Sequence, residues 1–227
     1  MIAFATPLRS RSDSPGRLPF RRLTTRLLFA LLAPAMLLGS RAAAEGIWSP
    51  FPSAPPPATT PGPRHGMGMI LDQVGQRVVV FGGYRSGLNH ATNDTWTGTL
   101  DPTPVFDSLE IAIAPSPRYG HGAVYDPVRQ RMLVFDGRSD TQVVPMDAWE
   151  LDLSGNPTLW SSVPMQGIIP SGRQGGVAVY DPVRDRVLLF GGYDNVAFHN
   201  EVLVFTPGAL SSWSILPTAG VPPTGRN

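Results

Sequence analysis

The sequence predicts an all-β fold made of about three consecutive four-stranded sheets. Short apolar runs end in a glycine step that recurs at intervals of 54 and 55 residues, with its second glycine at Gly83, Gly137 and Gly192. An arginine upstream of each run keeps nearly the same interval, at Arg64, Arg118, Arg173 and Arg226. No stretch of residues 64–227 has a sustained helical period. A period near 50 residues built of short apolar runs is typical of a repeat array or a propeller.

Residues 1–44 have the pattern of a secretory signal peptide and N-terminal extension. They hold seven arginines and one acidic residue, an apolar run at 27–39, and three alanines at 42–44. A basic region, a short apolar core and small residues at the cleavage site are the order expected for export. The run is shorter than the roughly 20 residues of a membrane-spanning helix. We therefore expect a secreted, periplasmic or cell-surface protein with no membrane span after cleavage.

Residues 45–63 are expected to be a linker. Positions 49–63 are rich in proline and show no periodicity, as in extended polyproline segments.

Each of the repeats 64–117, 118–172 and 173–225 is expected to contain four strands. The first strand follows the arginine, as at 122–125, and an Asp-x-Val-x-x-Arg turn leads into the second, as at 187–190. The second strand is apolar without alternation, so we expect both of its faces to be buried. The third and fourth strands are expected around Trp96, Trp149 and Leu203, and near Phe106, Trp160 and Trp213.

This set of residues in register resembles the kelch repeat. The matching features are the glycine pair after an apolar strand, Asp-x-Trp at 94–96 and 147–149, a second tryptophan, and a proline-containing step into the arginine. The sequence departs from the pattern where Asp136 replaces a first glycine and where 201–203 replaces Asp-x-Trp. The resemblance covers about residues 46–227 and implies a kelch-type β-propeller.

A propeller closes with typically about 4–8 blades, whereas this sequence holds three repeats and the start of a fourth at 224–227. Trp48 looks like part of a ring-closing outer strand, as is usual in the family. We expect a partial propeller, with the remaining blades supplied by a longer chain. A half-propeller completed by dimerisation is the alternative.

Residues that recur in every repeat are expected to be structural, because a buried arginine must be paired. Asp94, Asp147 and Glu201 are the expected partners of the arginines. The structural set is Arg64, Gly82, Gly83, Trp96, Arg118, Gly137, Trp149, Arg173, Gly191 and Gly192.

The sequence offers no set of residues for catalysis, a metal or a cofactor. The absence of cysteine excludes disulfides and thiolate chemistry. It also removes the Tyr–Cys cross-link that resemblance to galactose oxidase-type copper enzymes would require. We expect His65 and His121 to pack inside blades, and His90 and His199 to lie in surface loops. Residues 45–227 carry 11 basic and 16 acidic side chains, which disfavours a nucleic-acid partner.

The segments after the glycine pairs vary between repeats while the strands do not, and such variation on a constant frame is how a binding face is built. In kelch domains that bind peptides, these residues face the mouth of the channel. The alternative is that Tyr84 and Tyr193 only cap strand ends. The candidate ligand-binding residues are Tyr84, Arg85, His90, Arg138, Asp140, Tyr193, Asp194 and His199.

The first functional hypothesis is therefore an exported, non-enzymatic kelch propeller that binds a protein or a glycan at this loop face. The alternative is the propeller region of a larger carbohydrate oxidase or sugar isomerase whose catalytic residues lie outside this chain. A third hypothesis is a surface-assembly module in which the propeller is a spacer.

Overall fold

The computed structural model describes residues 60–102 and 104–226, which belong to a compact unit at 49–227. These residues form thirteen strands and no helix, so the predicted all-β fold is confirmed. None of the described residues forms a helix that could cross a membrane. The predicted signal peptide, nearly all of the linker and the strand near Trp48 lie outside the described residues.

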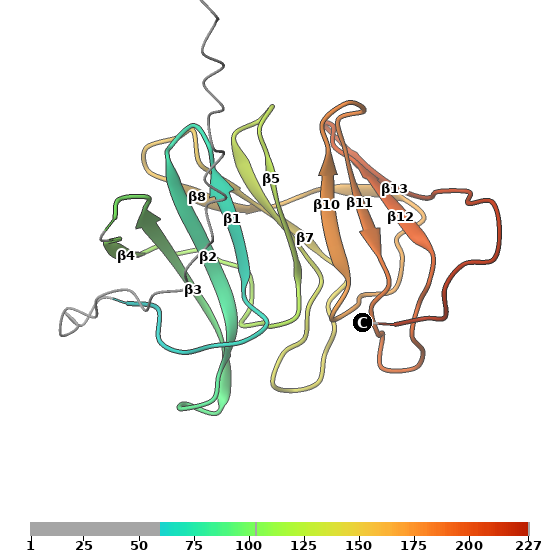
Figure 1. Cartoon of the computed structure of the whole chain (residues 1–227), viewed down its shortest axis with the longest axis horizontal. Coiled ribbons are helices and arrows are strands. Elements are labelled where there is room, and N and C mark those ends of the chain that lie inside the picture. Colours follow the sequence, from blue (N-terminus) through green and yellow to red (C-terminus); the bar gives the residue numbers. More distant parts are fainter. Residues whose placement is uncertain (1–59, 103, 227) are drawn as a thin grey trace, which may run out of the picture. The chain divides into compact units, whose positions relative to one another are not determined.

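Three sheets lie side by side, and four strands of each come from one sequence repeat (Figure 1). We call them blades 1, 2 and 3. Blade 1 contains β1 (Gly68–Asp72), β2 (Arg77–Arg85), β3 (His90–Thr99) and β4 (Phe106–Leu109). Blade 2 contains β5 (Gly122–Asp126), β6 (Arg131–Phe135), β7 (Ala148–Asp152) and β8 (Leu159–Ser162). Blade 3 contains β10 (Val177–Asp181), β11 (Arg186–Phe190), β12 (Val202–Thr206), β13 (Ser211–Ile215) and, at its edge, β9 (Met165–Gly167).

The first hairpin of each blade is built in the same way. In blade 1, Asp72 pairs with Arg77 at the turn, and its carboxylate accepts hydrogen bonds from the amides of Val74 and Gly75 and from Nε of Arg77. The equivalent carboxylates of Asp126 and Asp181 bond in the same pattern. An aspartate that accepts from amides two and three residues ahead stabilises a tight turn, which explains the recurring Asp-x-Val-x-x-Arg sequence.

Two hydrophobic layers hold the three blades together. Alternate residues of β6 face opposite ways: Met132 and Val134 pack in the layer shared with blade 1, and Leu133 and Phe135 in the layer shared with blade 3. All four are fully buried, as expected for a strand with a sheet on each side. In β11, by contrast, Leu188 and Phe190 are only half-buried, because the described residues form no further sheet on that face of blade 3.

Strand β9 was not predicted. It follows blade 2 in sequence but pairs in parallel with β13, which makes blade 3 five-stranded. Its residues Met165-Gln166-Gly167 have no apolar run or β-branched side chain that would indicate a strand. Burial of Met165 against the indole of Trp213 and the hydrogen bonds to β13 place it there.

Candidate functional site

The repeat arginines fix the base of the loop face. Arg64 binds both carboxylate oxygens of Asp94, at 2.7 and 2.8 Å, and also donates to the carbonyl of Gly82 at 2.9 Å. Arg118 makes the same contacts with Asp147, at 2.6 and 2.8 Å, and with the carbonyl of Asp136. Each arginine therefore connects an aspartate in the third strand of its blade, or directly before it, to the glycine step, and the predicted partners are confirmed.

The aspartate of Asp-x-Trp has two donors, which explains the motif. Asp94 also accepts a hydrogen bond of 2.6 Å from the indole N–H of Trp96, and Asp147 accepts one of 2.9 Å from Trp149. Burial raises the pKa of Asp94, but the hydrogen bonds from Arg64 and Trp96 outweigh it and lower the pKa to about 2. The carboxylate thus stays ionised at neutral pH.

Blade 3 keeps only half of this arrangement. Arg173 reaches Glu201 through one nitrogen, at 2.6 Å, and Leu203 stands where the other blades have tryptophan. The nitrogen Nε of Arg173 is buried without a partner among the described residues.

The second glycine of each step bonds to the next repeat. The amide of Gly83 donates to the carbonyl of Arg118, that of Gly137 to Arg173, and that of Gly192 to Arg226, at 2.8 to 2.9 Å. This geometry needs a left-handed backbone, with φ of 101° at Gly83 and 92° at Gly192. The predicted need for positive φ and close approach at the glycine pairs is confirmed.

The residues directly above this base pair through their backbones but differ in side chain. His65 pairs with Tyr84, Tyr119 with Arg138, and Gln174 with Tyr193, each as an isolated antiparallel bridge. One member follows the repeat arginine and the other follows the glycine pair. Because the backbone makes the bridges, the side chains are free to differ from blade to blade.

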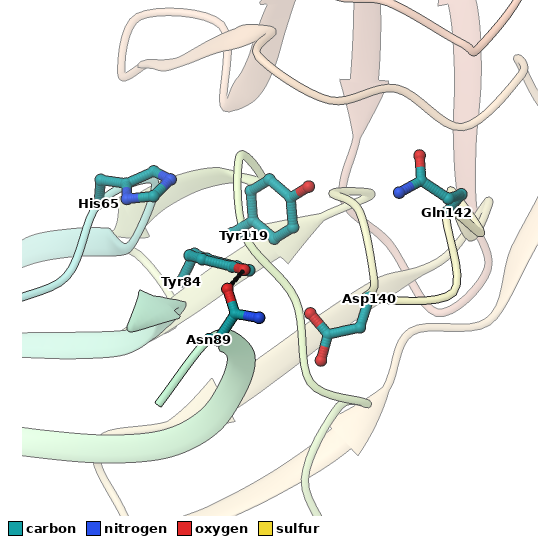
Figure 2. Close-up of a pocket in the computed structure, with 6 residues that line it drawn as sticks. All are labelled: His65, Tyr84, Asn89, Tyr119, Asp140 and Gln142. Atoms are coloured by element: carbon teal, nitrogen blue, oxygen red, sulfur yellow. Dashed lines mark hydrogen bonds between the residues drawn. The ribbon is translucent and has the colours of Figure 1, made fainter. Parts of the chain in front are cut away.

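One pocket opens between these residues in blades 1 and 2, with a volume of about 330 Å³ (Figure 2). Blade 1 contributes residues from before β1, from the end of β2 and from the β2–β3 turn. Blade 2 contributes residues from before β5 and from the β6–β7 loop. The pocket is lined by His65, Tyr84, Asn89, Tyr119, Asp140 and Gln142.

Three rings form one wall of this loop-face pocket. The centroid of Tyr84 lies 5.2 Å from that of His65 and 5.3 Å from that of Tyr119, and the two tyrosines meet edge to face. The hydroxyl of Tyr84 donates to Oδ1 of Asn89 at 2.8 Å, as Figure 2 shows. Asp140 stands on the other side, held by a 2.8 Å hydrogen bond from the amide of Ala91 to its Oδ1. These groups can hold a ligand without covalent chemistry.

A second pocket of about 520 Å³ adjoins the first on blade 1. It shares His65 and contains Arg85, one of the predicted binding residues. The rest of its lining is Pro63, Arg64, Ser86, Gly87 and Leu88.

The structure thus brings two predicted residues, Tyr84 and Asp140, into the loop-face pocket and places Arg85 beside it. Arg138 and Tyr193 occupy the matching bridge positions of blades 2 and 3 without lining this pocket. His90 is exposed next to Arg85, and its Nδ1 lies 2.8 Å from the carbonyl of Ala91.

Asp194 and His199 bind each other instead of lining the pocket. His199 Nε2 lies 2.8 Å from Oδ2 of Asp194, and its Nδ1 lies 3.2 Å from Glu201. Hydrogen bonds from the amide of Ala197, from His199 and from the amide of Val196 hold the pKa of Asp194 well below its usual range. Together they brace the β11–β12 loop.

The expectation for His65 was wrong. This side chain is exposed and lines the pocket, because it lies outside the first strand at a bridge position. The prediction for His121 is confirmed, since it is buried between blades 1 and 2 against Phe81.

Tyr119 and Gln142 were not predicted. Tyr119 could have been found, because it follows Arg118 directly and so repeats the position of His65 with the 54-residue period. Gln142 lies in a loop of unmatched length and has no such signal. Among residues 60–102 and 104–226 there is no cluster of three His, Asp or Glu side chains that could hold a metal ion.

Comparison with known proteins gives consistent matches. Residues 73–227 match the model of the KLHDC2/KLHL20/DRC7 Kelch-repeats domain. The chain is 32% identical over 126 residues to dynein regulatory complex subunit 7 of Chlamydomonas reinhardtii, covering 56% of this chain and 10% of that protein. It is 27% identical over 168 residues to Kelch domain-containing protein 3 of Bos taurus, covering 68% and 42% respectively. It is 30% identical over 158 residues to tip elongation aberrant protein 1 of Schizosaccharomyces pombe, covering 67% and 13%. The chain thus spans less than half the length of each of these relatives.

Proposed function

Because the chain belongs to the kelch-repeat family, whose domains generally mediate protein interactions, we propose that it is a non-enzymatic scaffold that binds a protein ligand at its loop face. One observation carries this proposal. Backbone bridges hold six positions in a constant frame, and the side chains at three of them, His65, Tyr84 and Tyr119, line a pocket between blades 1 and 2. Aromatic residues in a pocket are common anchors of protein interfaces.

A peptide selection tests the proposal. The full 227-residue chain would be immobilised and challenged with a random peptide library, and the selected peptides measured by calorimetry. We expect binding that Tyr84→Ala weakens by about tenfold, since it removes an aromatic anchor worth more than about 1 kcal/mol.

Val183→Ser is the matched control for this experiment. Val183 is exposed at the β10–β11 turn, the opposite end of the sheets from the loop face, so its substitution should leave peptide affinity unchanged. Equal loss of affinity in both variants would contradict a binding site at the loop face. If no peptide is selected, and the chain instead binds a glycan array in a way that Tyr84→Ala abolishes, the ligand is a glycan and not a protein.

Export is a separate part of the proposal, and it rests on the basic region, apolar run and alanines of residues 1–44. Expression of the whole chain in a secreting bacterial host should give a mature protein outside the cytoplasm that begins near Glu45. N-terminal sequencing checks this. A chain that remains in the cytoplasm and retains residues 1–44 would refute it.

A further inference from the structure

We propose that the loop-face pocket binds an alkylammonium cation, such as the head group of a lysine side chain on the partner. This inference rests on the proposed function and specifies the chemistry of the ligand. It follows from the combination of ring faces, one carboxylate and the absence of arginine from the residues lining this pocket.

The wall of three rings supplies the first attraction. His65, Tyr84 and Tyr119 are mutually within 5.2 to 6.2 Å between centroids, so a group entering the pocket meets several ring surfaces at once. Aromatic faces carry negative charge density and attract cations within about 6 Å of the centroid. Groups of aromatic rings recognise alkylammonium ligands for this reason.

Asp140 supplies the charge. Its Oδ1 accepts a hydrogen bond from Ala91, while its Oδ2 makes no hydrogen bond within the described part of the chain. The side chain is exposed on the wall opposite the rings, as Figure 2 shows. One carboxylate oxygen is therefore available to a cation that contacts the rings.

The equivalent place between blades 2 and 3 provides an internal comparison. There the bridge positions hold Tyr119, Arg138 and Gln174 in place of His65, Tyr84 and Tyr119. An arginine and an amide replace two rings, so that place carries a fixed positive charge. The cation preference is expected only between blades 1 and 2.

The pocket is also open enough for a long side chain. His65, Asn89, Asp140 and Gln142 are exposed, while the two tyrosines are half-buried. A cavity of about 330 Å³ with such a rim lets an ammonium group enter while its aliphatic stem remains outside.

The first test is a titration of the full chain with choline at fixed ionic strength, in which binding is measured by NMR. We expect saturable shifts, and at least about fivefold weaker binding of 3,3-dimethylbutan-1-ol, the neutral analogue of the same shape. A lysine peptide and its norleucine counterpart form a second arm. Preference for the lysine peptide over choline indicates a protein source of the cation, and preference for choline indicates a small organic cation.

Three variants locate the site. Tyr119→Leu and Asp140→Asn should each weaken choline binding about three- to tenfold. Asparagine can still accept the hydrogen bond from Ala91, so the loop is retained. Tyr193→Leu removes a ring of blade 3 at the position equivalent to Tyr84, outside this pocket, and should have no effect. Circular dichroism melts verify that all variants fold.

The outcomes separate this inference from the proposed function. Equal affinity for choline and its neutral analogue, or unchanged affinity in Asp140→Asn and Tyr119→Leu, overturns the cation site. If selected peptides bind at the loop face but lack lysine, the scaffold function stands and the cation inference fails. If choline binds as expected and no peptide does, the cation site stands and the protein-binding proposal fails.

Discussion

Single residues with long-range bonds fix the shape of each blade. Arg118 is 1% exposed and joins Asp147, the carbonyl of Asp136 and the carbonyl of Ser116. Within residues 60–102 and 104–226, Arg226 repeats only the last of these contacts, donating to the carbonyl of Thr224 two residues before it. The same residue type at the same repeat position thus has different weight in blade stability.

Arg118→Ala should therefore lower the free energy of unfolding by about 3 kcal/mol or more, because it leaves a buried carbonyl unpaired and Asp147 with only the indole of Trp149 as a donor. Arg226→Ala, the matched control, should change it by less than about 0.5 kcal/mol, since Arg226 is exposed. Urea denaturation of both variants measures this. Similar losses would show that the clamp is not the stabilising feature.

Asp136 is the one glycine-pair position that carries a side chain. Its backbone is left-handed, with φ of 56°, and its carboxyl is buried. Burial, with the nearby charge of Asp147, raises the pKa of Asp136 well above its usual range. The folded state therefore resists ionisation of this group. The resulting loss of stability appears as the pH rises above 3.8, the ordinary pKa of an aspartate side chain.

Asp136→Gly should consequently raise the free energy of unfolding by about 1–2 kcal/mol at pH 7, by relieving the left-handed backbone and removing the buried carboxyl. The gain should shrink as the pH falls towards 4, where the carboxyl is protonated in the folded state at little cost. Denaturation at both pH values checks the sign. A variant less stable than the parent at pH 7 would refute this account.

At this scale the sequence predicts residues that repeat. The arginines, the glycines and their acidic partners follow from their common interval, and so does the turn aspartate. The exposure of His65 could not be predicted, because a histidine beside an arginine has no local pattern that distinguishes a bridge position from a core position. The role of Gln142 depends on how its loop folds over blade 2, where Asn195 of blade 3 bonds to its carbonyl.

Among secondary-structure elements, the β-strands were predictable from their apolar runs and turns. The four strands of each repeat appear where they were expected. Strand β9 could not be predicted, because it is defined by a partner 46 residues ahead, as in the pair Met165 and Ser211, and not by its own composition. The position of each glycine step at the end of the second strand was predictable. Whether a larger residue fits there depends on how closely neighbouring backbone approaches, which the sequence does not show.

Gly192→Ala should cost about 3 kcal/mol of stability. Its backbone has φ of 92°, and an added Cβ would lie 2.9 Å from Cβ of Arg173, so the change combines strain with overpacking. Gly87→Ala is the control, because an added Cβ there meets nothing within 4 Å. Thermal melts of the two variants should differ by several degrees. Equal melting temperatures would mean that the glycine step is not tightly packed.

At the scale of the whole described structure, the contacts between blades hold the three sheets together. His121 lies in the layer between blades 1 and 2, and neither ring nitrogen has a partner among the described residues. Burial, with the charge of Arg118, lowers its pKa to about 3. The unfolded chain takes up a proton below pH 6.5 that the folded chain cannot. The contribution of neutral His121 to stability is therefore full above pH 6.5 and declines as the pH falls towards 3.

Between pH 7 and pH 5 the parent should lose about 2 kcal/mol more stability than His121→Met. Methionine is the residue at the equivalent position of blade 1, Met67, so the substitution follows the chain's own repeat. Urea denaturation of both proteins at the two pH values isolates this contribution, because Asp136 and the other carboxyl groups are present in both. An identical pH dependence in both proteins would remove His121 as its cause.

The main-chain bonds between neighbouring repeats also have a consequence for evolution. The amide of Gly120 donates to the carbonyl of Gly66, and the amide of Gly175 to that of Gly120, both at 2.7 Å. These bonds and the bridges beside them involve no side-chain atom. Mutations at the six bridge positions can therefore accumulate at little cost to folding, and a new specificity can arise by exchanging a few exposed or half-buried side chains while the underlying architecture is inherited intact.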